Sequence, residues 1–246
     1  MKKSVFTIKG IRPLAAGTYE LSLAGDASAV TAPGQFVNLE LPGKFLRRPI
    51  SICDWGEDAL LLLVKEAGAG TRELAMMPPG TKLDVLSGLG NGFDLSRIGK
   101  SPVLAGGGIG VAPLYGLARR MIEYGTPPAA VVLGFRSGAE SFYTDEFAAL
   151  GCPVFISTED GSLGTAGFVT DLIRDLPDCT YVLSCGPLPM LKAVHSLPQL
   201  RGGQFSFEAR MGCGFGACMG CSVPVKGGYK RICKDGPVLF WEEIVW

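Results

Sequence analysis

In Pro102-Val103-Leu104-Ala105-Gly106-Gly107-Gly108-Ile109-Gly110-Val111-Ala112-Pro113, a short apolar strand runs into a glycine-rich turn and then into the start of a helix. This order opens a doubly wound α/β domain, in which parallel strands alternate with helices. Glycines at such a turn let a dinucleotide pyrophosphate approach the backbone and the positive N-terminus of the helix. The strict G-x-G-x-x-G spacing is absent, so a tight turn without a ligand remains the alternative interpretation.

The alternation of strands and helices continues from this stretch to about residue 208. We predict strands at 102–105, 129–135, 153–157, 181–184 and 204–208, and helices at 111–124, 142–150, 168–176 and 188–196. Strands that alternate with helices form a parallel sheet with helices on both faces. The sequence therefore predicts a doubly wound parallel α/β domain.

Two further segments follow strands of this predicted sheet. Cys185-Gly186-Pro187 comes after the strand at 181–184, and open α/β sheets bind ligands at the carboxyl ends of their strands. Plain packing of a lone cysteine explains Cys185 equally well. Thr158-Glu159-Asp160 ends another strand, where an acidic residue can bind ribose hydroxyls and repel a 2′-phosphate. That pattern favours NAD over NADP, although solvated acidic turn residues are an equally good account.

The first hundred residues have a different pattern, in which short β-rich runs are separated by glycine and proline. We predict strands at 4–8, 18–23, 35–41, 50–53, 60–65 and 82–86, and one short helix at 71–77. Short strands at regular spacing are typical of a β-barrel or a sandwich. The chain therefore combines an all-β part with an α/β part.

Two segments of the β-rich part are suited to anionic ligands. Arg47 and Arg48 precede Pro49-Ile50-Ser51 beside a buried-looking strand, where a charge without a partner is costly. Arginine also binds phosphate in a bidentate fashion. Gly68-Ala69-Gly70-Thr71-Arg72 leads into the short helix and offers backbone N–H groups and a hydroxyl. Together the two segments predict a second pyrophosphate site, and surface salt bridges with an ordinary turn explain them equally well.

Four cysteines near the C-terminus have the spacing C-x4-C-x2-C-x11-C, namely Cys213, Cys218, Cys221 and Cys233. A C-x4-C-x2-C run with a fourth cysteine further on is the plant-type [2Fe–2S] pattern. Structural zinc prefers C-x2-C pairs, and disulfide frameworks belong to small secreted chains. We therefore predict a [2Fe–2S] cluster over zinc. Three other cysteines, Cys53, Cys152 and Cys179, are expected to be small buried hydrophobic residues.

The amino-acid composition limits the classes of protein to which this chain can belong. The 246 residues contain 23 Lys+Arg and 23 Asp+Glu, so nothing favours nucleic acid or a polybasic membrane contact. No run reaches eighteen apolar residues, so no transmembrane helix is expected. Eight cysteines and a metal centre fit a reducing cytoplasm. The single histidine, His195, argues against histidine-based acid–base chemistry, and we expect it on the exposed surface of a helix.

The patterns divide the chain into three parts. We expect a β-barrel at 1–98, an α/β domain at 99–205 and a small cluster module at 206–246. Glu208 lies just before the cluster cysteines, where either a place at the redox site or a salt bridge with Arg210 is expected, the salt bridge being favoured. The last residues include Trp241 and Trp246, which indicate a partner surface or packing of the tail against its own domains.

Taken in order, these motifs resemble those of the ferredoxin–NADP reductase superfamily. The resemblance rests on a flavin motif R-x-[YF]-S at Arg48-Pro49-Ile50-Ser51, a flavin-phosphate turn at Gly70-Thr71, a G-G-G-x-G-x-x-P segment at 106–113 and a C-G-P segment at Cys185-Gly186-Pro187. Ile50 departs from the pattern, because an aromatic residue often flanks the isoalloxazine there. With the cysteine spacing added, essentially the whole chain is similar to the electron-transfer subunits of class 1B dihydroorotate dehydrogenases.

The resemblance implies an FAD-binding antiparallel β-barrel, an NAD-binding α/β domain and a [2Fe–2S] module, with no catalytic acid or base. The implied FAD contacts are Arg48, Pro49, Ile50, Ser51, Leu63, Val64, Lys65, Gly70 and Thr71. The implied NAD contacts are Gly106, Gly107, Gly108, Gly110, Cys185, Gly186 and Pro187. The implied cluster ligands are the four cysteines Cys213, Cys218, Cys221 and Cys233.

The resemblance also implies a partner, an FMN-containing catalytic subunit that oxidises dihydroorotate. Two copies of each subunit would form a heterotetramer in the cytoplasm, and electrons would pass from FMN through the cluster and FAD to NAD+. The alternative is an NAD(P)H-dependent reductase subunit of another complex, such as a glutamate synthase-, hydrogenase- or sulfite-reductase-like one. A zinc-stabilised redox sensor without turnover is a further alternative.

Overall fold

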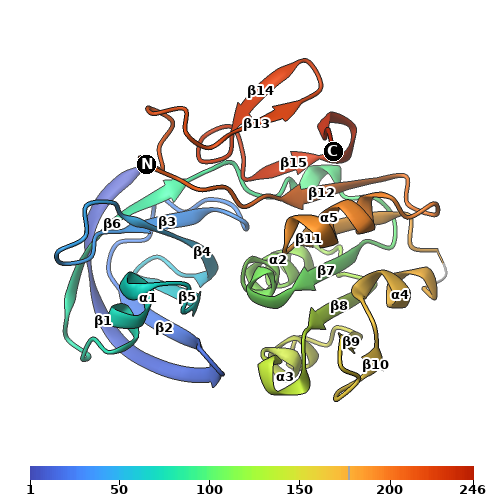
Figure 1. Ribbon diagram of the computed structural model, residues 1–246, viewed down its shortest axis with the longest axis horizontal. Coiled ribbons are helices and arrows are strands. Elements are labelled where there is room, and N and C mark those ends of the chain that lie inside the picture. Colours follow the sequence, from blue (N-terminus) through green and yellow to red (C-terminus); the bar gives the residue numbers. More distant parts are fainter. Residues whose placement is uncertain (177) are drawn as a thin grey trace.

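The computed structural model describes residues 1–176 and 178–246. Its N-terminal part is a closed antiparallel barrel with the strand order β1-β2-β5-β4-β3-β6 (Figure 1). The strands are β1 (Lys2–Ala15), β2 (Thr18–Ala24), β3 (Phe36–Leu39), β4 (Arg48–Trp55), β5 (Ala59–Lys65) and β6 (Lys82–Leu89). Alternate side chains fill the interior, as Val37 and Leu39 of β3 do. The predicted barrel is confirmed, because β1 pairs with both β2 and β6 and so closes the ring of strands.

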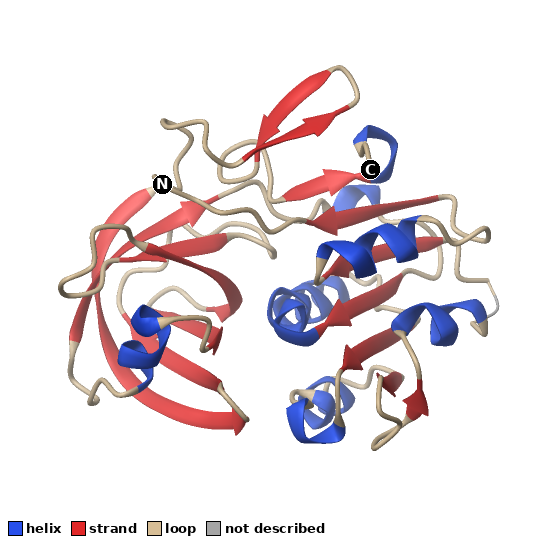
Figure 2. Cartoon of the chain, in the orientation of Figure 1, coloured by secondary structure: helices blue, strands red, loops and turns tan. Residues whose placement is uncertain are grey.

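The second sheet has seven strands in the order β10-β9-β8-β7-β11-β12-β15, and Figure 2 shows helices flanking it. Its strands are β7 (Val103–Gly107), β8 (Ala130–Phe135), β9 (Val154–Thr158), β10 (Thr165–Ala166), β11 (Tyr181–Cys185), β12 (Gly202–Ser206) and β15 (Val238–Phe240). All neighbours are parallel except β12 and β15. The doubly wound sheet is therefore confirmed, with one antiparallel edge strand added.

Helices cover both faces of this sheet. They are α2 (Val111–Glu123), α3 (Thr144–Ala149), α4 (Val169–Arg174) and α5 (Leu188–His195), whereas α1 (Ala69–Ala75) follows β5 and belongs to the barrel. Leu104 and Val131 pack against α2 and α3, whereas their neighbours Val103 and Val132 pack against α4 and α5. Because successive side chains of a strand point to opposite faces of the sheet, one set contacts the helices on one face and the other set contacts the helices on the opposite face. In the described part of the chain, no helix has the length and apolar character that crossing a bilayer requires.

Helix α2 also attaches the sheet to the barrel. Gly116 lies so close to β4 that a Cβ there would overlap the carbonyl oxygen of Cys53. The next turn of α2 carries Arg119, which pairs with Asp54, and Arg120, whose guanidinium lies 4.3 Å from the ring centroid of Trp55. A helix with a glycine at the closest approach and charges beside it therefore fixes the two halves against each other. The expected burial of the other cysteines holds for Cys53, Cys152 and Cys179.

The C-terminal segment has a hairpin of its own and then returns to the large sheet. The hairpin is formed by β13 (Ser222–Val225) and β14 (Gly228–Arg231), and the short 3-10 turns of the chain are η1 (Leu95–Arg97), η2 (Gly108–Gly110), η3 (Gly138–Glu140) and η4 (Trp241–Glu243). Trp241 stacks on His195 with ring centroids 3.9 Å apart. His195 is consequently half-buried rather than exposed, and the tail packs on its own sheet here.

Candidate functional site

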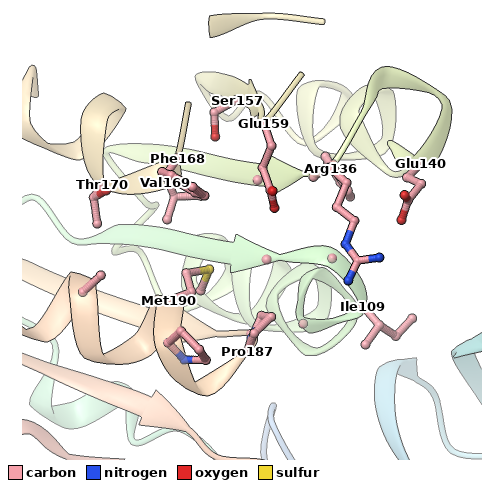
Figure 3. Close-up of a pocket in the computed structure, with 18 of the residues that line it drawn as sticks. Ile109, Arg136, Glu140, Ser157, Glu159, Phe168, Val169, Thr170, Pro187 and Met190 are labelled. Atoms are coloured by element: carbon pink, nitrogen blue, oxygen red, sulfur yellow. The ribbon is translucent and has the colours of Figure 1, made fainter. Parts of the chain in front are cut away.

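A cavity of about 570 Å³ lies where the carboxyl ends of the parallel strands face the barrel. Its walls come from the turns after β7, β8, β9 and β11, and the barrel contributes Thr18 and Lys65. Figure 3 shows the side chains that extend into it. The position follows the general rule that open α/β sheets bind ligands outside the carboxyl ends of their strands. Because both halves supply the walls, a ligand here would lie between barrel and sheet.

The glycine-rich turn after β7 forms the floor of the cavity. Gly107, Gly108 and Gly110 line it, whereas Gly106 is buried against α2. Gly108 has a φ of +52°, a conformation that favours glycine. A Cβ at Gly110 would overlap the backbone carbonyl of Cys185. The turn thus brings the N-terminus of α2 against the end of β11, where it can meet an anionic group.

The Cys185-Gly186-Pro187 segment meets the same cavity with only part of its residues. Gly186 and Pro187 line the cavity, and Cys185 does not. The Cys185 thiol is 2% exposed, and burial raises its pKa to about 12. The thiol is therefore neutral and lies behind the cavity wall, where it supports the turn.

Two charged side chains enter the cavity from neighbouring strands. Arg136 follows β8 and Glu159 follows β9, and Figure 3 shows both side chains extending into the same space. Glu159 belongs to a segment that the sequence singled out, whereas Arg136 was missed. The sequence pattern that could have revealed Arg136 is the one that revealed Glu159, namely a polar residue directly after a buried parallel strand.

Glu208 also lines the cavity, between β12 and the cluster cysteines. The expected salt bridge with Arg210 is wrong, because Arg210 does not lie within 4.0 Å of the Glu208 carboxylate. Burial of that carboxylate raises its pKa. Glu208 therefore belongs to the cavity rather than to an ion pair on the surface.

The predicted flavin motif lies on β4, and the structure separates its two arginines. Arg47 pairs with Glu40 and lies 2.7 Å from Asp84. Arg48 donates to the carbonyl of Leu46, and no carboxylate of the described residues lies within 4.0 Å of its guanidinium. Only the second arginine thus keeps its charge available for an anion. The motif residues Arg48, Pro49, Ile50 and Ser51 are all half-buried, as expected for a surface that a flat ligand completes.

The start of α1 lies directly against Arg48. A Cβ added at Gly70 would lie 2.8 Å from Nε of Arg48, so a larger residue would displace the guanidinium. The hydroxyl of Thr71 accepts hydrogen bonds from the backbone N–H groups of Ala67 (2.9 Å) and Gly68 (3.2 Å). The hydroxyl therefore shapes the turn instead of remaining free. An arginine beside the unpaired N–H groups of a helix start fits a diphosphate.

The other predicted flavin contacts lie on β5. Leu63 and Val64 are buried, so they would meet a ligand through their backbone. Lys65 is exposed and its Nζ lies 3.5 Å from Oε2 of Glu140. Because Lys65 comes from the barrel and Glu140 from η3, this pair spans the cavity from one wall to the other.

The four cysteines of the C-terminal segment form two neighbouring pairs. The first pair is Cys213 with Cys218, and the second is Cys221 with Cys233. Burial, then the nearby thiols Cys221 and Cys213, raises the pKa of Cys233 to about 12. In the described residues, no three thiol, imidazole or carboxylate groups gather closely enough to coordinate a single metal ion. Two adjacent pairs fit a binuclear cluster, which takes two thiolates on each iron, better than mononuclear zinc.

Backbone N–H groups surround the first pair. The Sγ of Cys213 accepts from the N–H groups of Ala217 (3.3 Å) and Cys218 (3.5 Å). Slight burial opposes ionisation, but donors that include the N–H of Phe215 outweigh it and lower the pKa of Cys213 to about 6. A loop that stabilises thiolates through its own N–H groups is suited to iron–sulfur ligation.

Comparisons with known proteins agree with this geometry. Residues 208–245 match the family model described as the iron–sulfur cluster binding domain of dihydroorotate dehydrogenase B. A solved structure of an NADH-dependent reduced ferredoxin-NADP oxidoreductase, a protein studied for flavin-based electron bifurcation, is 29% identical. It superposes with a TM-score of 0.86 and covers 98% of this chain and 90% of its own.

Two curated relatives cover the chain from end to end. The electron transfer subunit of dihydroorotate dehydrogenase B (NAD(+)) from Geobacillus sp. (strain WCH70) is 42% identical in an alignment of 257 residues that covers 100% of this chain and 99% of the relative. The corresponding subunit from Shouchella clausii (strain KSM-K16) is 43% identical over 99% of this chain and 98% of its own length. The chain belongs to the family of dihydroorotate dehydrogenase B (NAD(+)) electron transfer subunits.

Proposed function

We propose that this chain carries electrons from the FMN of a dihydroorotate dehydrogenase catalytic subunit through a [2Fe–2S] cluster and FAD to NAD+, in pyrimidine biosynthesis. The observation that carries the proposal is the adjacency of the three sites. Cys213, the first of the cluster cysteines, lies against β3, whose neighbour β4 bears the flavin motif. The cavity for the nicotinamide lies between the same barrel and the strand ends of the sheet.

The proposed roles follow the geometry of each site. Arg48 holds the flavin diphosphate against the start of α1, and Ser51 bonds near the ring. The further FAD contacts are Pro49, Ile50, Leu63, Val64, Lys65, Gly70 and Thr71. NAD is held by Gly106, Gly107, Gly108, Gly110, Cys185, Gly186 and Pro187, with Gly106 and Cys185 acting from behind the wall. The cluster ligands are Cys213, Cys218, Cys221 and Cys233.

A bound flavin exchanges electrons singly or in pairs, which is the chemistry needed between a one-electron cluster and a two-electron nicotinamide. The chain's own residues position the groups and exclude water, since hydride passes directly and needs no acid or base. The proposed functional parts of the chain are an FAD-binding part at 1–98, an NAD-binding part at 99–205 and a cluster-binding part at 206–246. The strand β15 ties the last part to the sheet of the second.

The proposed partner is the FMN-containing catalytic subunit, with two copies of each subunit in a heterotetramer. The cluster segment exposes Phe215, Met219 and Tyr229, and apolar side chains of this kind favour an interface beside the cluster. Eight cysteines, four of them the proposed cluster ligands, fit a reducing compartment, so the cytoplasm is the proposed location.

Co-expression with the catalytic subunit tests the proposal. The purified pair should reduce NAD+ with dihydroorotate, and neither chain alone should do so. Native mass analysis should give two copies of each chain with FMN, FAD and [2Fe–2S]. Activity with ferredoxin but none with dihydroorotate would instead favour the ferredoxin-linked relative of 29% identity.

We expect Glu159 to set the preference for NAD over NADP. Its carboxylate shares the cavity with Arg136 and would repel a 2′-phosphate that the arginine could otherwise accept. Removing one charge at a partly exposed site is worth roughly 1.4 kcal/mol. Glu159→Gln should therefore raise the kcat/KM ratio of NADPH to NADH about tenfold, as measured by dye reduction.

Asp160→Asn is the matched control for that substitution. Asp160 carries the same charge one residue later, but its carboxylate is engaged by Ser162 and does not line the cavity. The control should keep the wild-type ratio. Combining Glu159→Gln with Arg136→Gln should abolish the gain, and a gain that persisted would assign the phosphate to another residue.

A further inference from the structure

Asn38 is a buried polar residue at the junction of the barrel and the cluster segment. It lies on β3 between Val37 and Leu39, whose side chains fill the barrel interior. Strand alternation therefore directs Asn38 to the outer face of the barrel. The residue is nevertheless only 1% exposed. Figure 1 shows the chain after β12 crossing to the side of the barrel where β3 lies.

The side-chain amide of Asn38 contacts the first cluster cysteine. Its Nδ2 donates a hydrogen bond to the carbonyl oxygen of Cys213 at 3.1 Å. Gly214, with a φ of +76°, packs so closely that a Cβ there would overlap the amide nitrogen. A residue with a Cβ would have to displace the Asn38 amide, so the loop lies directly against Asn38.

Burial of the same amide is energetically unfavourable at its oxygen atom. Among the described residues, the buried Oδ1 of Asn38 has no hydrogen-bond partner, and burying an acceptor without a partner is destabilising. An apolar side chain of similar shape would avoid that cost. What only the amide supplies is the hydrogen bond to the Cys213 carbonyl.

On its other side, Asn38 belongs to the ladder that bears the flavin motif. It is paired with Pro49 across β3 and β4, and its neighbour Leu39 is paired with Arg48. The guanidinium of Arg47 donates to the carbonyl of Asn38 at 3.3 Å. Asn38 thus connects the backbone of the cluster ligand Cys213 to β4, the strand that bears the flavin motif.

We infer that Asn38 is a positioning residue, which fixes Cys213 against the flavin strand and so sets the cluster's reduction potential and the rate of electron exchange between cluster and flavin. The inference rests on the proposed function. Hydrogen bonds to the sulfurs tune iron–sulfur potentials, and outer-shell partners orient the ligands themselves. Asn38 holds the backbone of Cys213, whose Sγ accepts from the N–H groups of Ala217 and Cys218. Loss of the Asn38 donor releases that backbone and weakens these N–H contacts to sulfur, which makes the cluster harder to reduce.

The test uses the full chain, reconstituted anaerobically, and the variants Asn38→Leu and Asn38→Asp. NADH reduces the flavin and then the cluster, which stopped-flow absorbance and rapid-freeze electron paramagnetic resonance follow separately. Cluster reduction should slow by about tenfold or more in the leucine variant, while flavin reduction keeps its rate. Redox titration should show a more negative cluster potential, with the larger shift for the aspartate variant because it adds a charge.

Asn91→Leu is the matched control. Asn91 also ties the tail to the barrel side, through hydrogen bonds of 2.7 and 3.1 Å to the backbone of Val238 and one of 3.4 Å to the carbonyl oxygen of Asp235, and it makes no hydrogen bond to any of the four cysteines. Unchanged potential and rate in both Asn38 variants would overturn the inference, and so would equal changes in the Asn91 variant. If the leucine variant lost its cluster, an unaltered unfolding temperature together with a shifted potential in the aspartate variant would still support it. Absence of iron from the wild-type chain would instead contradict the proposed function.

Discussion

Replacing Cys218 with serine should abolish electron transfer to the partner while sparing the nicotinamide half of the chemistry. Cys218 is the exposed member of the first thiol pair, and removing a ligand from a four-cysteine cluster leaves one iron under-coordinated. Dihydroorotate-dependent NAD+ reduction by the complex should fall by at least about 100-fold. Iron and acid-labile sulfide should fall in parallel, as chemical analysis and electron paramagnetic resonance can measure.

Flavin content and NADH-dependent reduction of a soluble dye should survive in this variant, because the cavity and β4 lie outside the cluster loop. Cys152→Ser is the control, since Cys152 is buried behind α3 and has no part in the thiol pairs. If dye reduction vanished with FAD still bound, the division of labour between cluster and flavin sites would be wrong.

Replacing Arg48 with alanine should weaken FAD retention more than any other single change in the barrel. The Arg48 guanidinium lies beside Gly70 at the start of α1, and no carboxylate of the described residues lies within 4.0 Å of it. A charge-assisted phosphate contact contributes about 1.5–3 kcal/mol. The dissociation constant of FAD should therefore rise by about 10- to 150-fold, as measured by titration of the apoprotein with FAD.

Arg47→Ala provides the comparison, because it removes the same charge one residue earlier. Arg47 is committed to Glu40 and Asp84, and Asp84 keeps Lys3 at 2.8 Å when Arg47 is lost. This variant should retain FAD at the wild-type level. Equal flavin loss in both variants would show that general damage to the barrel, rather than the phosphate contact, is responsible.

Local patterns were sufficient to predict the order and type of the elements. Period-two runs, glycine breaks and strand–turn–helix alternation are short-range features, because they reflect which side chains one segment can bury. The extents were less accurate. β1 was expected at 4–8 and spans Lys2–Ala15, because its pairing with both β2 and β6 extends it. The tail strand β15 was missed, since its partner β12 lies more than thirty residues away.

The candidate site divides in the same way. The cysteine spacing and the glycine-rich turns are formed by residues close together in the sequence, so the sequence alone determined the cluster segment, the two turns proposed to bind phosphates and the family resemblance. Which arginine of Arg47-Arg48 is free was decided by the distant carboxylates Glu40 and Asp84.

Only the tertiary structure placed Arg136 and Glu208 around one cavity and Asn38 against Cys213. Those contacts join residues up to 175 positions apart. They arise because parallel strands bring their carboxyl ends to one edge, and because the loop after β12 folds back on the barrel. A segment's own sequence specifies what it can bury, whereas the partner that covers it follows from how the whole chain packs.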